Sequence, residues 1–208
     1  MSVVALIGNK GGSGKTTLAV NMATLLSEHN AIAVIDADPL KSASYWRSCD
    51  NTGNRPNVLE ASLDLESVIL KSAARYEHVF IDCPPSMQSP QTHAALEVCD
   101  MALIPVQPSP FDLWSTVSID KSIEHAKKVN SKLKAMLIIN QLEPRKRLSK
   151  VIRRGLSEID INAAETTIRR REIYRISALE GKSVSQMGRR GVAASQEIRD
   201  LINEVMCV

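Results

Sequence analysis

The residues with the clearest chemical meaning lie near the start of the chain, in a run rich in glycine. The segment Gly8–Thr16 follows the apolar residues Val3–Ile7. It contains four glycines and closes with the Gly-Lys-Thr of the phosphate-loop pattern G-x-x-x-x-G-K-[ST]. Glycines let such a loop turn its N–H groups inward onto phosphate oxygens, and the following helix adds the positive end of its dipole. The residues expected to bind a nucleotide here are Gly11, Gly12, Ser13, Gly14, Lys15, Thr16 and Thr17.

The two lysines of this segment are expected to act differently. In a phosphate loop Lys15 would reach the β- and γ-phosphates, and the Thr16 hydroxyl would ligate Mg²⁺. Lys10 lies inside the loop, where an ordinary phosphate loop needs no charge, so this extra cation narrows the class of protein. A plain glycine-rich turn between a strand and a helix is the alternative. The pattern and its context together disfavour it.

Three aspartates end apolar runs further along the chain. Asp36 and Asp38 follow the run at 31–35, and Asp82 follows the run at 78–81 in the form of a Walker B aspartate. A carboxylate at a strand end that faces a phosphate loop can hold a Mg²⁺-bound water or orient the attacking water. A solvated strand end is the alternative for each of them taken alone. Their position after the phosphate loop favours the functional interpretation.

The elements that must position these residues alternate along the chain. Strand-like runs occur at 3–7, 31–35, 57–60, 78–81, 101–106 and 134–139, and helical patterns at 16–28, 63–75, 88–98 and 114–129. After residue 140 the pattern weakens, and we expect a helix at 146–157, a short strand near 160–167, a turn or short helix at 172–179 and a final helix at 192–206. This order predicts an α/β fold, with a doubly wound, mostly parallel sheet and helices on both faces.

Length and composition agree with one soluble domain over residues 1–208. The chain is 44% hydrophobic and only 3% aromatic, so its core must be mostly aliphatic, as in a buried parallel sheet. No apolar run approaches the roughly 20 residues that span a bilayer, and we expect a cytoplasmic protein with no membrane contact. Cys49, Cys83, Cys99 and Cys207 form no C-x-x-C pair and are expected to be free thiols, with iron–sulfur ligation a minor alternative.

Charge is distributed unevenly along the chain. Residues 1–120 carry 7 basic and 13 acidic side chains, whereas residues 121–199 carry 19 basic and 8 acidic ones. Such a basic half on an acidic protein suggests nonspecific binding to the phosphates of double-stranded DNA, with a solvated surface as the alternative. Lys146, Lys150 and Arg154 recur at helical spacing. The residues expected to contact DNA are Lys146, Lys150, Arg154, Arg169, Arg170 and Arg171.

These motifs together resemble the ParA/MinD family of ATPases with a deviant Walker A loop, K-G-G-x-G-K-[ST]. The similarity covers nearly the whole chain, including Lys10–Thr17, Asp36–Pro39, Asp82–Pro85, the segment 105–112 and Gly181–Val184. Within the family the chain looks most like the short, ParF-like proteins that partition plasmids. The acidic final helix, with Asp200 and Glu204 beside its apolar stripe, differs from the basic amphipathic helix with which membrane-targeting members end.

The resemblance implies a role for each motif. The family binds ATP and Mg²⁺ in a homodimer that sandwiches the nucleotides, and Lys10 matches the lysine that crosses to the partner's phosphates. Lys15 and Thr16 match the phosphate and Mg²⁺ ligands, Asp36 the neighbour of the metal, and Asp82 the Walker B aspartate. Asp38 matches the residue that activates water, which makes Lys10, Lys15 and Asp38 the catalytic set. Asn140 matches an adenine-side position.

The resemblance also implies partners and leaves the cargo open. An ATP-bound dimer would bind nonspecific DNA on the nucleoid, and an adaptor or centromere-binding protein would stimulate hydrolysis. Plasmid segregation is the main hypothesis, and positioning of a protein organelle such as the carboxysome is the alternative. A biosynthetic enzyme of the same fold, such as dethiobiotin synthetase, is a rival that Lys10 and the basic half disfavour. A non-hydrolysing DNA-binding module is a third, which Asp38 disfavours.

Overall fold

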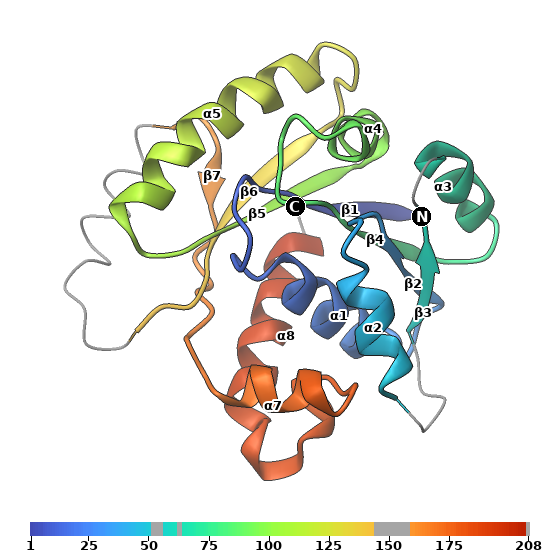
Figure 1. Ribbon diagram of the computed structural model, residues 1–208, viewed down its shortest axis with the longest axis vertical. Coiled ribbons are helices and arrows are strands. Elements are labelled where there is room, and N and C mark those ends of the chain that lie inside the picture. Colours follow the sequence, from blue (N-terminus) through green and yellow to red (C-terminus); the bar gives the residue numbers. More distant parts are fainter. Residues whose placement is uncertain (51–55, 62–63, 144–158, 207–208) are drawn as a thin grey trace.

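The apolar runs of the sequence form one parallel sheet at the centre of the molecule (Figure 1). The computed structural model describes residues 1–50, 56–61, 64–143 and 159–206. Within these residues seven strands pair in the order β3-β2-β4-β1-β5-β6-β7, and every pairing is parallel. The strands are β1 (Ser2–Leu6), β2 (Ile32–Asp36), β3 (Asn57–Glu60), β4 (His78–Asp82), β5 (Met101–Val106), β6 (Lys134–Ile139) and β7 (Asn162–Ala163).

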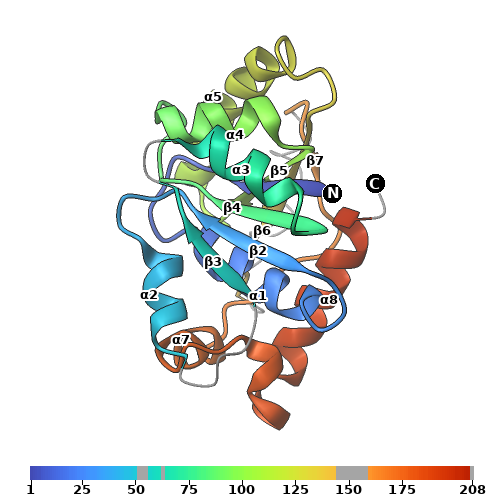
Figure 2. The same cartoon turned by 90° about the vertical axis from the view of Figure 1, so that its right-hand side faces the viewer.

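Helices cover both faces of this sheet, as Figures 1 and 2 show. One face packs against α3 (Leu65–Ala73), α4 (Pro90–Val98) and α5 (Pro110–Lys127). The other face packs against α1 (Lys15–Leu26) and α8 (Val192–Met206), with α2 (Ser42–Ser48) and α7 (Ile173–Leu179) beside them. Two short 3₁₀ turns, η1 (Val184–Gln186) and η2 (Gly188–Arg190), lead into α8. The predicted α/β fold with helices on both faces is confirmed.

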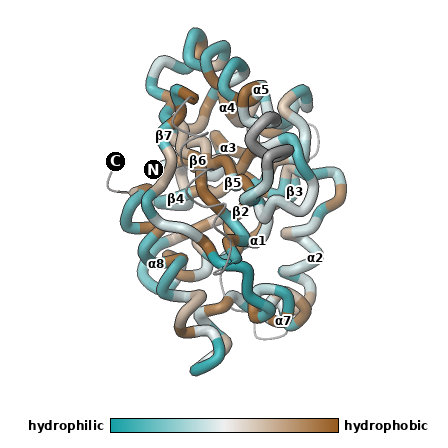
Figure 3. Tube along the Cα trace, turned by 90° about the vertical axis from the view of Figure 1, so that its left-hand side faces the viewer, coloured by the Kyte–Doolittle hydropathy of each residue, from teal (hydrophilic) through white to brown (hydrophobic). Residues whose placement is uncertain are grey.

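The side-chain alternation of the strands separates two apolar layers. Val3, Ala5 and Ile7 lie in the layer under α3, α4 and α5, whereas Val4 and Leu6 lie in the layer under α1 and α8. Both layers are mostly aliphatic, as the 3% aromatic content predicts. Figure 3 shows the same pattern, with apolar segments along the inner strands and polar ones on the outside. Because β1 is buried on both faces after Ser2, its sequence from Val3 to Leu6 is continuously apolar rather than alternating.

Several boundaries differ from the predicted ones. The α5 helix begins at Pro110, four residues before the predicted start, because proline fits the first turn of a helix. The short strand near 160–167 is reduced to Asn162–Ala163. The helix α2 was not predicted, because only Ala43 and Trp46 of its seven residues are buried and give almost no periodic signal. The predicted helix at 146–157 lies outside the described residues.

The C-terminal segment is tied to the first half of the molecule by buried polar contacts. The Asn21 side chain of α1 accepts a hydrogen bond from the Val184 N–H at 2.8 Å, and the Trp46 indole of α2 donates to the Lys182 carbonyl at 3.2 Å. The apolar stripe of α8 is buried against the sheet through Ile198, Leu201 and Val205. None of the helices formed by the described residues has the length and apolar character of a membrane span.

Candidate functional site

The glycine-rich loop and two of the aspartates meet at one edge of the sheet. The strands β2, β4 and β1 lie side by side, and their last residues, Asp36, Asp82 and Leu6, are in register. The loop leaves β1 at this level and enters α1 at Lys15. Since all strands are parallel, their carboxyl ends share one edge, which is where such folds bind ligands. The structure therefore brings together the predicted loop, Asp36 and Asp82.

The loop backbone depends on glycine at two positions. Gly12 and Gly14 have φ angles of 75° and 103°, in the left-handed region. A Cβ atom at Gly14 would also overlap the amide nitrogen of Asn140, so this position requires glycine twice over. The first position of the pattern G-x-x-x-x-G-K-[ST], five residues before Gly14, is held by Asn9 rather than by glycine. Its side chain accepts a hydrogen bond from the Met87 N–H at 2.9 Å and so fixes the loop to the segment after β4.

The two lysines of the loop differ in environment, as their spacing suggested. Lys15 is buried, and its ammonium donates to the Lys10 carbonyl at 3.2 Å. Burial lowers the pKa of Lys15, while the carboxylates of Asp82 and Asp38 act in the opposite direction. The Lys10 side chain is exposed. Lys15 is therefore buried within the site, and the Lys10 side chain lies on the surface beside it.

Two buried carboxylates beside the loop each have an oxygen that no described residue contacts through a hydrogen bond. The Thr16 hydroxyl donates to Asp82 Oδ2 at 2.6 Å, and Ser44 donates to Asp36 Oδ2 through its N–H at 2.8 Å and its hydroxyl at 2.9 Å. Among the described residues, no hydrogen bond reaches the other oxygen, Oδ1, of Asp36 or of Asp82, although both atoms are buried. Burial raises the pKa of Asp82 to about 7. The hydrogen bond from Thr16 lowers this pKa, whereas the nearby charge of Asp36 raises it further. A hydroxyl and two carboxylates are hard oxygen ligands, so this set fits Mg²⁺.

Asp38 lies where the chain turns from β2 into α2. Its Oδ1 accepts the Leu40 N–H at 3.0 Å, and its carbonyl accepts the Lys41 N–H at 2.8 Å. Lys41 closes this turn with a φ of 52° and pairs with Glu60 at 2.6 Å. The turn places Asp38 on the wall of the cleft described next, close to Lys15 and Asp82.

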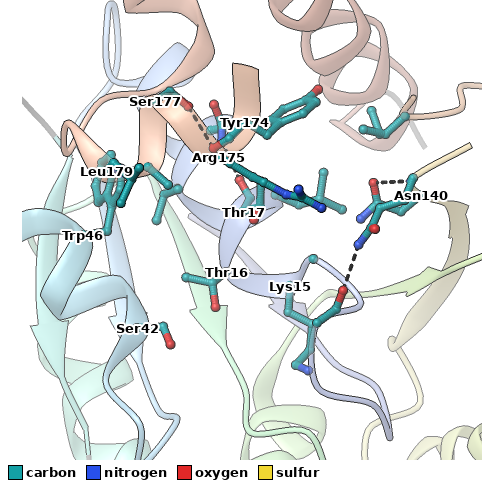
Figure 4. Close-up of a pocket in the computed structure, with 18 of the residues that line it drawn as sticks. Lys15, Thr16, Thr17, Ser42, Trp46, Asn140, Tyr174, Arg175, Ser177 and Leu179 are labelled. Atoms are coloured by element: carbon teal, nitrogen blue, oxygen red, sulfur yellow. Dashed lines mark hydrogen bonds between the residues drawn. The ribbon is translucent and has the colours of Figure 1, made fainter. Parts of the chain in front are cut away.

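A cleft of about 850 Å³ opens above the loop. Its walls come from α1, α2, α7 and the segment that precedes α7, and Figure 4 shows Trp46 and Leu179 on one side and Asn140 on the other, with Thr16 and Thr17 between them. This volume is in the range of pockets that bind small molecules and suffices for a nucleotide. The predicted residues that line it are Gly11, Gly12, Gly14, Lys15, Thr16, Thr17, Asp38 and Asn140.

The arginines at 169–171 line this same cleft. Arg171 pairs with Glu197 at 2.6 Å, Arg169 approaches the same carboxylate at 3.8 Å, and Arg170 pairs with Glu143 at 3.0 Å. Their expected contact with DNA stays a prediction. Lys146, Lys150 and Arg154, the other residues expected to bind DNA, lie outside the described residues.

Asn140 contacts the loop itself. Its Nδ2 donates to the Ser13 carbonyl at 2.6 Å, and its Oδ1 accepts the Gln141 N–H at 2.8 Å. Its predicted contact with adenine stays untested. Sequence reasoning missed Gln107 and Gln141, which also bind the loop, because an isolated glutamine after a strand has no recognisable pattern.

The buried thiols belong to the core rather than to this site. Cys83 and Cys99 lie in the apolar layer beneath α3, α4 and α5. Burial raises the pKa of the Cys83 thiol well above its ordinary value and that of Cys99 to about 12. Since the thiolate is the form that ligates metals, this environment disfavours the iron–sulfur alternative.

The comparison with known families decides the class. The family described as CbiA, the CobQ/CobB/MinD/ParA nucleotide binding domain, matches residues 4–184. The chain belongs to this family. The predicted ParA/MinD membership is thereby confirmed, and the family model covers the loop, the three aspartates and Asn140.

The relatives and solved structures that resemble this chain carry names that refer to different processes. A protein of Halothiobacillus neapolitanus named "maintenance of carboxysome distribution protein A" is 36% identical over 206 residues, covering 98% of this chain and 95% of that protein. Among solved structures, a plasmid partition protein of Borrelia burgdorferi bound to AMPPNP superposes with a TM-score of 0.77, 21% identity and coverage of 99% and 98%. The septum site-determining protein MinD of Pyrococcus horikoshii, in complex with Mg-ADP, superposes with a TM-score of 0.76 and 17% sequence identity. The match covers 99% of this chain and 97% of MinD. At these identities the two structures show the fold alone.

The buried carboxyl of Asp82 predicts a pH-dependent stability. Its pKa of about 7 in the folded protein exceeds the ordinary value of 3.8, so the folded state binds this proton more tightly than the unfolded state. Ionisation of Asp82 therefore destabilises the fold progressively as pH rises from about 4 to about 7. We expect Asp82→Asn, without Mg²⁺ or nucleotide, to raise the free energy of unfolding by at most about 4 kcal/mol at pH 8 and about 2 kcal/mol at pH 5.

Thermal or urea unfolding at pH 5, 6, 7 and 8 measures this effect. Asp200→Asn, which removes one carboxylate from the exposed side of α8, is the matched control. If the increase in the free energy of unfolding of Asp82→Asn did not grow with pH, this would contradict a raised pKa of Asp82 in the folded protein.

Proposed function

We propose that this chain is an ATP-dependent, dimerising ATPase that distributes a protein organelle of the carboxysome kind through an adaptor protein. The observation that carries the ATPase part is the pair of buried, unpartnered oxygens of Asp36 and Asp82 beside Thr16 and Lys15. Two buried carboxylates are costly in a folded protein unless a cation neutralises them, and a phosphate loop supplies the other half of a nucleotide site. The cargo is inferred from the full-length relative that is named for carboxysome distribution.

Each predicted residue has a place in this proposal. The N–H groups of the loop and the Lys15 ammonium bind the phosphates of ATP. Thr16, Asp36 and Asp82 hold Mg²⁺, which neutralises charge on the phosphates. Asp38 lies on the wall of the cleft near Lys15 and orients the attacking water. The cleft walls formed by the segment 168–182 then surround the nucleoside.

Lys10 is assigned to the partner subunit's nucleotide. Its side chain is exposed, whereas Lys15 already occupies the interior of the same loop. An exposed cation beside the phosphates can reach a second subunit that closes over the cleft, where it stabilises charge that develops on the transferred phosphoryl group. Binding of ATP to the dimer in preference to the monomer would couple the nucleotide state to assembly.

Replacement of Lys10 separates binding from hydrolysis. We expect Lys10→Ala to lower the ATPase rate at least 100-fold, with less than a fivefold loss of ATP affinity, because a transition-state charge is lost while the subunit's own loop stays intact. Phosphate release and equilibrium binding of fluorescent ATP are the measurements. Lys128→Ala, an exposed lysine just after α5, is the control and should leave both unchanged. Wild-type turnover in Lys10→Ala would remove its assigned role.

Nonspecific DNA binding is assigned to the ATP-bound dimer and the basic region that begins at Arg145. We expect retention on duplex DNA with ATP but not with ADP. Affinity should fall roughly tenfold or more between 50 and 200 mM salt, because each neutralised phosphate releases counterions. The variant Lys146→Glu/Lys150→Glu should weaken this binding, whereas Lys127→Glu/Lys128→Glu serves as its charge-matched control. Equal retention with ADP and ATP would contradict a nucleotide-controlled DNA switch.

Deletion of the gene in its own host tests the cargo. We expect fluorescently labelled carboxysome shells to lose their even spacing and to cluster, while a resident plasmid is inherited normally.

Plasmid partition is the second candidate function, and it is favoured by the ParA proteins among the relatives, such as one of Rhizobium radiobacter that is 27% identical over 151 residues. Plasmid loss with normally spaced shells would establish that second function instead. The full-length similarity to a distribution protein further disfavours a biosynthetic enzyme.

A further inference from the structure

Three amide side chains that follow β5 and β6 donate hydrogen bonds to carbonyl groups of the phosphate loop. Gln107, just after β5, donates from Nε2 to the Gly12 carbonyl at 2.9 Å. Gln141, just after β6, donates from its own Nε2 to the same carbonyl at 2.8 Å. Asn140 donates to the next carbonyl, that of Ser13, at 2.6 Å. Two consecutive carbonyls of the loop are therefore held by side chains that come from about 95 to 130 residues further along the chain.

The geometry of the peptide bond gives these contacts a direction. In a planar trans peptide the C=O and N–H groups point to opposite sides. The peptide whose carbonyl belongs to Gly12 carries the N–H of Ser13, and the peptide whose carbonyl belongs to Ser13 carries the N–H of Gly14. Holding the two carbonyls toward β5 and β6 turns these two N–H groups away from that side. Among the described residues, no acceptor pairs with the N–H of Ser13 or Gly14.

We propose that Gln107, Gln141 and Asn140 are positioning residues, which aim the Ser13 and Gly14 N–H groups at the phosphates of the nucleotide. The inference rests on the proposed nucleotide binding and adds to it the residues that preorganise the loop. Both lone pairs of the Gly12 carbonyl are used, so rotation of this peptide would break two hydrogen bonds. A glycine-rich loop would otherwise sample many backbone conformations, and binding would have to restrict them.

The backbone at Gln141 supports a dedicated role for its side chain. Its φ of 56° lies in the left-handed region, which is unfavourable for any residue except glycine and, to a lesser degree, asparagine. Glycine would fit this conformation better, yet would lack the amide that reaches Gly12. Neither glutamine is buried, so both can be replaced without opening a cavity in the core.

A double-mutant cycle tests the shared carbonyl. Because either glutamine alone still holds the Gly12 carbonyl, we expect Gln107→Ala and Gln141→Gly singly to weaken the binding of fluorescent ADP less than threefold. The double variant should weaken it at least tenfold, more than the product of the single effects. The melting temperature without nucleotide should stay within 2 °C of wild type, because Gln141→Gly also relieves the backbone. The control is Gln196→Ala, which removes an exposed glutamine of α8 that is hydrogen-bonded to Asp200.

The amide resonances of Ser13 and Gly14 give an independent readout. In the wild type both should shift downfield when ADP binds, and in the double variant both shifts should shrink. Wild-type affinity in the double variant would overturn the proposal. Parallel losses of affinity and of melting temperature would reduce the glutamines to structural supports and overturn it as well. Failure of the wild type to bind ADP would instead refute the proposed function, and with it the role of these residues.

Discussion

The arrangement of the whole site depends on two carboxylates placed in neighbouring strands in the low-dielectric interior. Asp36 and Asp82 are in register across β2 and β4, and each keeps one buried oxygen without a hydrogen bond from the described residues. Like charges at this separation raise the free energy of the folded protein, and a single hydroxyl from Thr16 relieves only part of it. The fold accepts this cost at the point where a divalent cation and a phosphate would remove it. Stability and ligand binding are therefore opposed at these two residues.

The parallel sheet explains how a few residues from neighbouring strands can hold the phosphate loop from two sides. With β1 in the middle of the sheet, the loop that follows it has β4 on one side and β5 on the other. The first neighbour ends at Asp82, which accepts the Thr16 hydroxyl, and the second leads to Gln107, which donates to the Gly12 carbonyl. The loop is thus held between the proposed Mg²⁺ ligands on one side and the side chains that bind its carbonyls on the other. Neither face could be formed by α1 and β1 alone.

The sequence predicted the fold and most of the site because the relevant residues follow simple rules. The strands at 101–106 and 134–139 and the final helix at 192–206 agree with the structure to the residue, since each is marked by a clear apolar run or stripe. Asp36 and Asp82 could be foreseen because acidic residues at the ends of parallel strands must gather at one edge, and Thr16 because it closes the phosphate-loop pattern. The sequence could not reveal Gln107, Gln141 or the ion pairs of Arg169 and Arg171 with Glu197. These contacts depend on side-chain directions that no periodicity encodes.

The contacts that complete the site span most of the chain. Asn140 reaches back 127 residues to Ser13, Lys182 lies 136 residues beyond Trp46, and Val184 lies 163 residues beyond Asn21. During synthesis the phosphate loop leaves the ribosome well before the segments around residues 140 and 182–184 that complete these contacts. Until those segments have been made, a growing chain carries its most recognisable motif without them. Under the proposed function, full nucleotide affinity should consequently be acquired only after residue 184 has been made, which would keep ATP away from partly folded chains.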